Sequence, residues 1–108
     1  MADNDKKVEK GRQGGLAVKE RPKVARPKMY KVLLHNDDFT TMEFVVWILM
    51  TVFHKDEAES AHVMLHVHRT GLGVAGVYTR EIAETKCKKV TALARKHEFP
   101  LQCTSEEA

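Results

Sequence analysis

The chain has little of what marks secreted, membrane-spanning or disulfide-rich proteins. Its 108 residues include only two cysteines, three prolines and one tryptophan. Because Cys87 and Cys103 lack CxxC spacing, we expect reduced, inert thiols in the core or half-buried, and no disulfide framework. No apolar run reaches the length of a membrane span, and the residues after Met1 do not resemble a signal peptide. These absences predict a cytoplasmic protein with no membrane contact.

The sequence also lacks the patterns that accompany common catalytic and cofactor sites. It contains no GxSxG, P-loop, GxGxxG or HExxH motif and no cluster of cysteines and histidines. Of its six histidines, His62 and His66 share one face of an expected helix, whereas His66 and His68 do not. A metal-binding domain is therefore a weak alternative, and we expect no metal, no other cofactor and no enzyme activity.

What the chain does contain is one domain preceded by a charged extension. The hydrophobic fraction, 43%, is close to that of ordinary globular proteins. Residues 1–27 combine many Lys and Arg with Gly and Pro and almost no large apolar side chains, so we expect a flexible extension there and a folded domain over residues 28–108. A small nucleic-acid-binding domain is the second alternative, but no aromatic residues interleave with these charges, so we expect no nucleic-acid partner.

Hydrophobic periodicity predicts the element order β-α-α-β-α-β. Thr40 with Glu43, and Asp56 with Glu59, form capping patterns at the starts of the first two helices. Gly71 is a suitable residue to end the second helix. The expected strands cover residues 29–34, 73–78 and 101–104, and the expected helices cover residues 41–53, 56–70 and 79–99.

The polar turn between the first strand and the first helix is the best candidate for a binding site. Asn36, Asp37 and Asp38 follow an apolar strand directly, so carboxylates lie beside an apolar face. Asp37 would accept the N–H groups of a charged ligand while Asp38 stabilises the turn; the alternative is an ordinary Asx turn at an acidic helix start. His68 is either a half-buried core histidine or a neutral partner for an ammonium group.

Two methionines bear on the same site. Met42 and Met64 would by default fill irregular space in the core. They become binding residues only if both lie beside the polar turn. In that case the site would suit a molecule that carries an amine next to a bulky apolar group.

A series of short motifs, in order along the chain, resembles the ClpS adaptor family. The likeness covers residue 28 to the C-terminus, with departures at Thr41, where the family commonly has Pro, and at His66, where smaller residues are frequent. The resemblance implies an α+β domain in which a three-stranded antiparallel sheet packs against three helices, after a disordered N-terminal arm. The motifs are Met29-Tyr30-Lys31-Val32, Asn36-Asp37-Asp38-Phe39-Thr40, Met42-Glu43-Phe44-Val45, Met64-Leu65, Val67-His68, Gly76-Val77-Tyr78-Thr79, Ala83-Glu84-Thr85-Lys86 and Pro100-Leu101-Gln102-Cys103-Thr104.

The resemblance also implies a function. A ClpS-like protein would be a monomeric adaptor that binds N-degron substrates, whose N-terminal residue is Phe, Tyr, Trp or Leu. It would deliver them to the N-domain of a ClpA-type Clp AAA+ ATPase, which feeds the ClpP protease. By resemblance, the α-amino group would contact Asn36, Asp37 and His68. The hydrophobic pocket would comprise Thr40, Met42, Val45, Met64, Val67 and Leu101, and the ATPase would dock on Glu81, Glu84 and Lys86.

Overall fold

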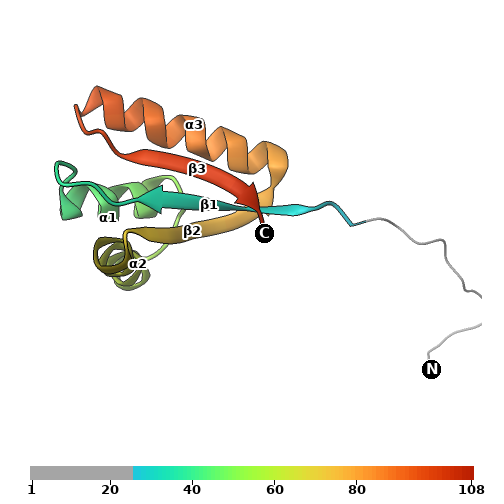
Figure 1. Cartoon of the computed structure of the whole chain (residues 1–108), viewed down its shortest axis with the longest axis horizontal. Helices are drawn as coiled ribbons and strands as arrows, with labels where there is room; N and C mark the ends of the chain where they lie inside the picture. Colours follow the sequence, from blue (N-terminus) through green and yellow to red (C-terminus); the bar gives the residue numbers. More distant parts are fainter. Residues whose placement is uncertain (1–25) are drawn as a thin grey trace, which may run out of the picture.

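The structure, a computed structural model, describes residues 26–108. The expected flexible extension over residues 1–27 therefore falls almost wholly outside the described residues. Within them, six elements follow in the predicted order β-α-α-β-α-β (Figure 1). They are β1 (Met29–His35), α1 (Met42–Thr51), α2 (Glu57–Thr70), β2 (Leu72–Thr79), α3 (Arg80–Lys96) and β3 (Gln102–Glu107).

The strands form one antiparallel sheet in the order β2-β1-β3, so the first strand of the chain lies at its centre. Val32 and Leu34 of β1 are fully buried, which agrees with the apolar character of this segment. The pairing with β2 shifts register between Val32 and Leu33, where Ala75 forms an extra residue on β2, as in a β-bulge. The predicted α+β fold with an antiparallel sheet is confirmed.

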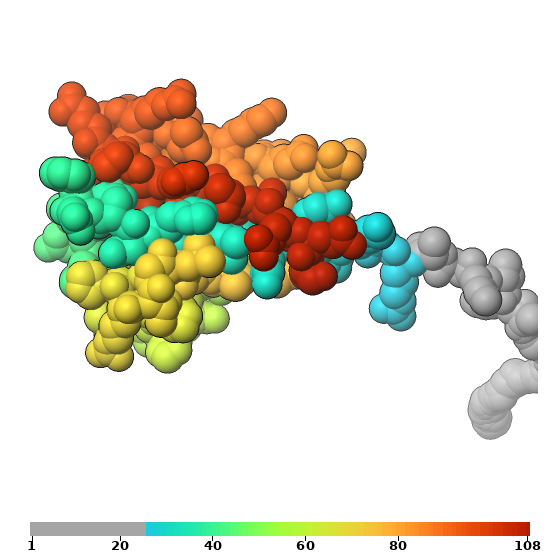
Figure 2. All heavy atoms as spheres, viewed as in Figure 1, coloured from blue at the N-terminus to red at the C-terminus, as the bar shows by residue number. Residues whose placement is uncertain are grey.

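The helices pack against the sheet through their buried apolar side chains. In Figure 1, α3 runs along the β3 side of the sheet, while α2 lies beside β2. On the face seen in Figure 2, side chains of β1 and β3 form the surface and no helix covers them. The core therefore lies on the other face, and its helical members are Phe44, Val45, Ile48, Leu49, Val67, Ala83, Val90 and Ala94.

The first helix begins one residue later than predicted. Thr41 is its N-cap, because the Thr41 hydroxyl accepts a hydrogen bond from the Phe44 amide at 3.1 Å. Thr40, the expected cap, instead donates both its amide and its hydroxyl to Asp37. Two adjacent threonines have equal capping ability, and the nearby carboxylate decides between them.

The second helix begins and ends as predicted. The Asp56 carboxylate accepts the Glu59 amide at 2.7 Å, which satisfies one of the free donors at the helix start. At the other end Gly71 adopts φ 91°, a conformation that few other residues tolerate, and its amide donates to the Val67 carbonyl at 2.8 Å. This sharp stop places the last turn of α2 next to the end of β1.

The C-terminal elements differ from the prediction in their bounds. Helix α3 stops at Lys96, well before Pro100, and Glu98 turns the chain with φ 62°. Strand β3 extends to Glu107 because it pairs with β1 as far as Tyr30. Its last residues are polar, so no apolar alternation marks them as a strand. Lys28 and Lys31 lie 3.6 Å from the carboxylates of Glu107 and Glu106, respectively, along this extension.

Candidate functional site

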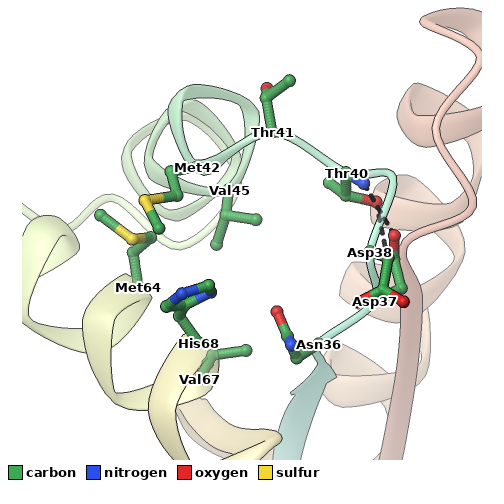
Figure 3. Close-up of a pocket in the computed structure, with 10 residues that line it drawn as sticks. All are labelled: Asn36, Asp37, Asp38, Thr40, Thr41, Met42, Val45, Met64, Val67 and His68. Atoms are coloured by element: carbon green, nitrogen blue, oxygen red, sulfur yellow. Dashed lines mark hydrogen bonds between the residues drawn. The ribbon is translucent and has the colours of Figure 1, made fainter.

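A cavity of about 320 Å³ lies where the end of β1, the start of α1 and the end of α2 meet (Figure 3). This volume is at the small end of the range for ligand pockets, so it suits one bulky side chain and its nearest polar group. The lining residues are Asn36, Asp37, Asp38, Thr40, Thr41, Met42, Val45, Met64, Val67 and His68.

A backbone hydrogen bond holds the polar side of the cavity together. The Asn36 amide donates to the Gly71 carbonyl at 3.0 Å, which joins the turn after β1 to the end of α2. The Asn36 side chain consequently points into the cavity, on the same side as His68 (Figure 3). The side-chain amide of Asn36 offers its carbonyl oxygen as an acceptor, and a neutral His68 ring offers an unprotonated nitrogen. The two side chains together form a site that can accept N–H groups.

The Asp37 carboxylate anchors the turn that follows β1. One oxygen, Oδ1, accepts the amides of Phe39 and Thr40 at 2.8 and 2.7 Å, and Oδ2 accepts the Thr40 hydroxyl at 2.7 Å (Figure 3). The turn-stabilising role that the sequence suggested for Asp38 is therefore carried by Asp37. A carboxylate has further acceptor positions, so Oδ2 keeps capacity for a ligand.

These contacts also set the charge of Asp37. Burial alone raises the pKa of this carboxyl group, but hydrogen bonds from the Thr40 hydroxyl and from the amides of Phe39 and Thr40 favour the ionised form more strongly. The net result is a pKa below the ordinary value of 3.8. Asp37 is thus negatively charged at neutral pH and places an anion at the edge of the cavity.

The opposite wall of the cavity is apolar. Met42 and Met64 lie side by side, and Val45 projects towards the space between them and the polar turn (Figure 3). Val67 is 2% exposed and Val45 is 7% exposed, so they form a fixed inner surface, whereas Met42 is 44% exposed and lies at the rim. Methionine side chains adapt their shape to different apolar partners. The wall can therefore accommodate bulky groups of more than one shape.

The structure brings together all but one of the residues expected in the amine-binding and pocket sets. The exception is Leu101, which is 5% exposed, belongs to the hydrophobic core and does not line this cavity. Asp38 and Thr41 line the cavity but were not among the expected pocket residues. Their signal in the sequence was their position directly beside Asp37 and Met42.

The three residues expected to dock an ATPase have different surroundings. Glu81 and Glu84 are exposed on the first turns of α3, and Glu84 pairs with Arg80 at 3.3 Å. Lys86 is half-buried, and its Nζ donates to the Val52 carbonyl at 2.7 Å. The same Nζ lies 5.7 and 5.2 Å from the ring centroids of Phe53 and Tyr78. Lys86 therefore fastens α3 to the end of α1.

The part of the chain over residues 26–108 contains no group of three or more His, Cys, Asp or Glu side chains placed to hold a metal ion. None of its helices has the length and apolar character needed to cross a membrane.

The chain is similar to known proteins over almost its entire length. Residues 25–104 match the family described as ATP-dependent Clp protease adaptor protein ClpS. The ATP-dependent Clp protease adapter protein ClpS of Rhodospirillum centenum is 53% identical over 107 residues, covering 99% of each chain. The protein of the same name from Lawsonia intracellularis is 61% identical over 85 residues, covering 79% of this chain and 78% of its own.

A solved structure gives the same result. The structure of Agrobacterium tumefaciens ClpS2 bound to L-phenylalaninamide is 47% identical in sequence, with a TM-score of 0.74. It covers 77% of this chain and 100% of its own. The family match over residues 25–104 includes every residue of the cavity and every element except the last part of β3. The chain belongs to the ClpS family of ATP-dependent Clp protease adaptor proteins.

Proposed function

We propose that this Clp protease adaptor binds proteins whose N-terminal residue is Phe, Tyr, Trp or Leu and delivers them to a ClpA-type AAA+ ATPase. The carrying observation is the cavity itself, which has hydrogen-bond acceptors on one side and two methionines on the other. A protein N-terminus of this class has the matching arrangement, because its ammonium group and its bulky side chain are attached to the same carbon atom.

Three side chains would hold the ammonium group in this proposal. Asn36 and His68 accept its N–H groups directly, and Asp37 supplies negative charge at the edge of the cavity. Hydrogen bonds between charged partners are roughly twice as strong as those between neutral ones. Because the bonds of Asp37 within the turn occupy much of its acceptor capacity, Asn36 and His68 are the stronger candidates for direct contact.

The ligand of the Agrobacterium structure supports this assignment. L-phenylalaninamide has a free α-amino group, a benzyl side chain and an amide in place of the carboxylate. It therefore resembles the first residue of a polypeptide that begins with Phe. The cavity described above has the size for such a group, and the two chains are 47% identical.

The sharpest test compares two peptides that differ by one acetyl group. A peptide beginning with Phe is titrated into the protein, followed by the same peptide with its N-terminus acetylated. Acetylation removes the charge and hydrogen-bond donors of the amine, so we expect affinity to fall about a hundredfold or more. Equal affinity for the two peptides would refute the proposed function.

Two variants connect this loss to the residues named. Asn36→Ala and His68→Ala should each weaken binding of the Phe peptide by about tenfold or more, because each removes a hydrogen bond to a charged group. His62→Ala is the matched control, since His62 is exposed on the same helix, α2, and does not line the cavity. An effect of His62→Ala equal to that of His68→Ala would assign the loss to α2 and not to the site.

The remaining parts of the proposal concern the partner and the setting. Glu81 and Glu84 would contact the N-domain of the ATPase, because they are exposed at the start of α3. The adaptor would act in the cytoplasm as a monomer, without a cofactor, enzyme activity or nucleic-acid contact. Binding and delivery would thus be separate steps that use different surfaces of one domain.

A further inference from the structure

The two cysteines of the chain lie directly against each other. Cys87 is on α3 and Cys103 is on β3, and their Sγ atoms are 3.4 Å apart. Both side chains are half-buried, one of the two surroundings that the sequence predicts, and their contact with each other has no signal in the sequence. The sulfur atoms of a disulfide are about 2.0 Å apart, so these two atoms would have to move about 1.4 Å closer to form the bond.

Cys87 can be reached from solvent through a basic hollow. The hollow has a volume of about 370 Å³ and is lined by Cys87, Lys88, Thr91, Ala92 and Arg95, with no acidic side chain. A second hollow, on the Cys103 side, shares Thr91 and Arg95 with the first. The positive charges of Lys88 and Arg95 would attract an anionic reagent to the pair of thiols.

The surroundings give the two sulfur atoms different chemical roles. Burial raises the pKa of the Cys103 thiol, and the neighbouring Cys87 raises it further, so Cys103 remains protonated and donates its S–H to Cys87. Cys87 lines the hollow beside Lys88 and Arg95, where the reagent would arrive. Because the thiolate is the nucleophile in disulfide exchange and Cys103 keeps its proton, Cys87 is the attacking residue and Cys103 is the resolving one.

We propose that Cys87 and Cys103 form an intramolecular disulfide by exchange with a small anionic disulfide such as oxidised glutathione. Cys87 attacks one sulfur of the reagent, which breaks its S–S bond and releases one small thiol with the proton that Cys87 gave up. Cys103 then loses its proton and attacks the Cys87 sulfur of the mixed disulfide, releasing the second small thiol. The two cysteines are oxidised by two electrons, and the reagent is reduced by the same two electrons.

The bond would link α3 to β3 and would not change the residues that line the cavity. Residues 87 and 103 are 16 apart in sequence, so the disulfide closes a short loop of the unfolded chain. All residues that line the cavity come from the turn after β1, from the start of α1 and from α2. Oxidation should therefore raise the melting temperature without changing the affinity for a peptide. This inference does not depend on the proposed function.

The test treats the full reduced chain with oxidised glutathione and follows its intact mass. Because the chain has only two cysteines, a monomer that is lighter by two hydrogen atoms contains the Cys87–Cys103 disulfide. We expect this species, together with a rise in melting temperature of roughly 10–20 °C. A chain that keeps both thiols, retains glutathione on one of them or forms disulfide-linked dimers would overturn the proposal.

Two serine variants test the order of the steps. Cys103→Ser should accumulate the mixed disulfide at Cys87, because the resolving thiol is missing. Cys87→Ser should react with oxidised glutathione at least about tenfold more slowly, because the remaining thiol is the one whose pKa is raised. Serine is close to cysteine in size, and a melting curve checks that each variant folds. Equal reaction rates for the two variants would overturn the assignment of Cys87 as the nucleophile.

Discussion

At the scale of single residues, the charge of Asp37 depends on the groups that surround it. The Thr40 hydroxyl and the amides of Phe39 and Thr40 favour the ionised carboxylate, which places its pKa below 3.8. A carboxyl group whose pKa is lower in the folded state stabilises the fold at pH values above its ordinary pKa. That contribution is lost as the pH falls below 3.8 and passes through the lowered pKa of the folded state.

Replacing Thr40 by Val should weaken this dependence on pH. The variant lacks the hydroxyl that donates to Asp37 Oδ2 at 2.7 Å, so the pKa of Asp37 should return towards its ordinary value. We expect the variant to be less stable at neutral pH and to lose less further stability on acidification. Melting temperatures measured from neutral pH to about pH 2 test this. Thr85→Val, at an exposed position of α3, is the control, and a Thr40→Val curve parallel to the wild-type curve would contradict the prediction.

Met42 should control which N-terminal residues can enter the cavity. In the proposed function it lies at the rim, where the Cβ of the bound residue would arrive. Ile and Val carry two heavy substituents on Cβ and would collide with it, at a typical cost of about 1–3 kcal/mol. The wild-type protein should therefore reject peptides that begin with Ile or Val. Met42→Ala should admit them and change affinity for Phe and Leu peptides only modestly.

The competing explanation for Met42 is a role in packing, and the structure supplies a matched control. Met50 lies on the same helix, is 40% exposed against 44% for Met42, and does not line the cavity. Met50→Ala should therefore match Met42→Ala in its melting temperature but keep the wild-type preference among Phe, Leu, Ile and Val peptides. If Met42→Ala also kept the wild-type preference, Met42 would have no role in specificity.

Most residues of the cavity could be predicted because they are close in sequence to two motifs. Asn36 to Val45 surround the polar turn, and Met64 to His68 form the last turns of α2. Leu101 is a different case, since it stands alone between Pro100 and a polar strand. No neighbouring pattern shows which way such a residue faces. In the structure it turns into the core instead of the cavity.

At the scale of elements, the end of α1 depends on a side chain from α3. The Val52 carbonyl lies at the C-terminal end of α1, where the helix itself offers no donor, and Lys86 donates to it at 2.7 Å. The ring centroids of Phe53 and Tyr78 lie 5.7 and 5.2 Å from the same ammonium group. The contact joins the first and last helices of the described domain.

Removing the Lys86 ammonium should therefore destabilise the domain. Lys86→Met keeps a similar length but leaves the Val52 carbonyl without its donor and removes the contacts with the rings of Phe53 and Tyr78. We expect a loss of about 1–3 kcal/mol in the free energy of unfolding, measured by urea denaturation. Lys89→Met is the control, because Lys89 is exposed on the same helix. Equal stability of the two variants would show that the Lys86 contacts are unimportant for folding.

A stability change in Lys86→Met would also alter the interpretation of ATPase binding by variants of α3. If Lys86→Met lowers stability, then a loss of ATPase binding in that variant cannot be assigned to a missing contact with the ATPase. Glu81 is a cleaner probe, because it is exposed and makes no ion pair in the described part of the chain. Delivery and stability should be measured together for every α3 variant.

Element bounds could be predicted where one residue alone fits the required conformation. Gly71 ends α2 because its φ of 91° suits glycine, and Asp56 has no competitor as the cap of the same helix. The start of α1 could not be fixed from sequence, since Thr40 and Thr41 offer the same hydroxyl. Likewise, the end of β3 depends on pairing with β1, a contact between residues far apart in the chain.

At the scale of the whole molecule, β1 separates the cavity from the start of α3, where the expected docking residues lie. Its C-terminal end leads into the turn that forms the cavity. Its N-terminal residue, Met29, pairs with Thr79 directly before α3. Seven residues of strand span about 20 Å, so the N-terminal extension joins the domain far from the cavity and close to Glu81. Figure 1 shows this arrangement, with the start of β1 beside the start of α3.

The arrangement predicts that binding and delivery can be separated by truncation. Deleting residues 1–25 leaves β1 and the cavity intact, so affinity for a Phe peptide should not change. Delivery should be impaired, because the deleted segment enters the domain beside the expected docking residues on α3. The measurement is the rate at which a Clp ATPase and its protease degrade a reporter protein that begins with Phe, with full-length and truncated adaptor compared at equal concentration.

The control for the truncation is a substitution at the neighbouring surface. In the full chain, Glu81→Lys reverses the charge of an exposed residue of α3 and should reduce binding of the adaptor to the ATPase. The truncated adaptor should instead keep that binding and still deliver slowly, because the extension would act after docking. If the truncated adaptor lost binding to the ATPase, the extension would be part of the docking surface. If it delivered at the full rate, residues 1–25 would have no part in delivery, and the folded domain alone would be the adaptor.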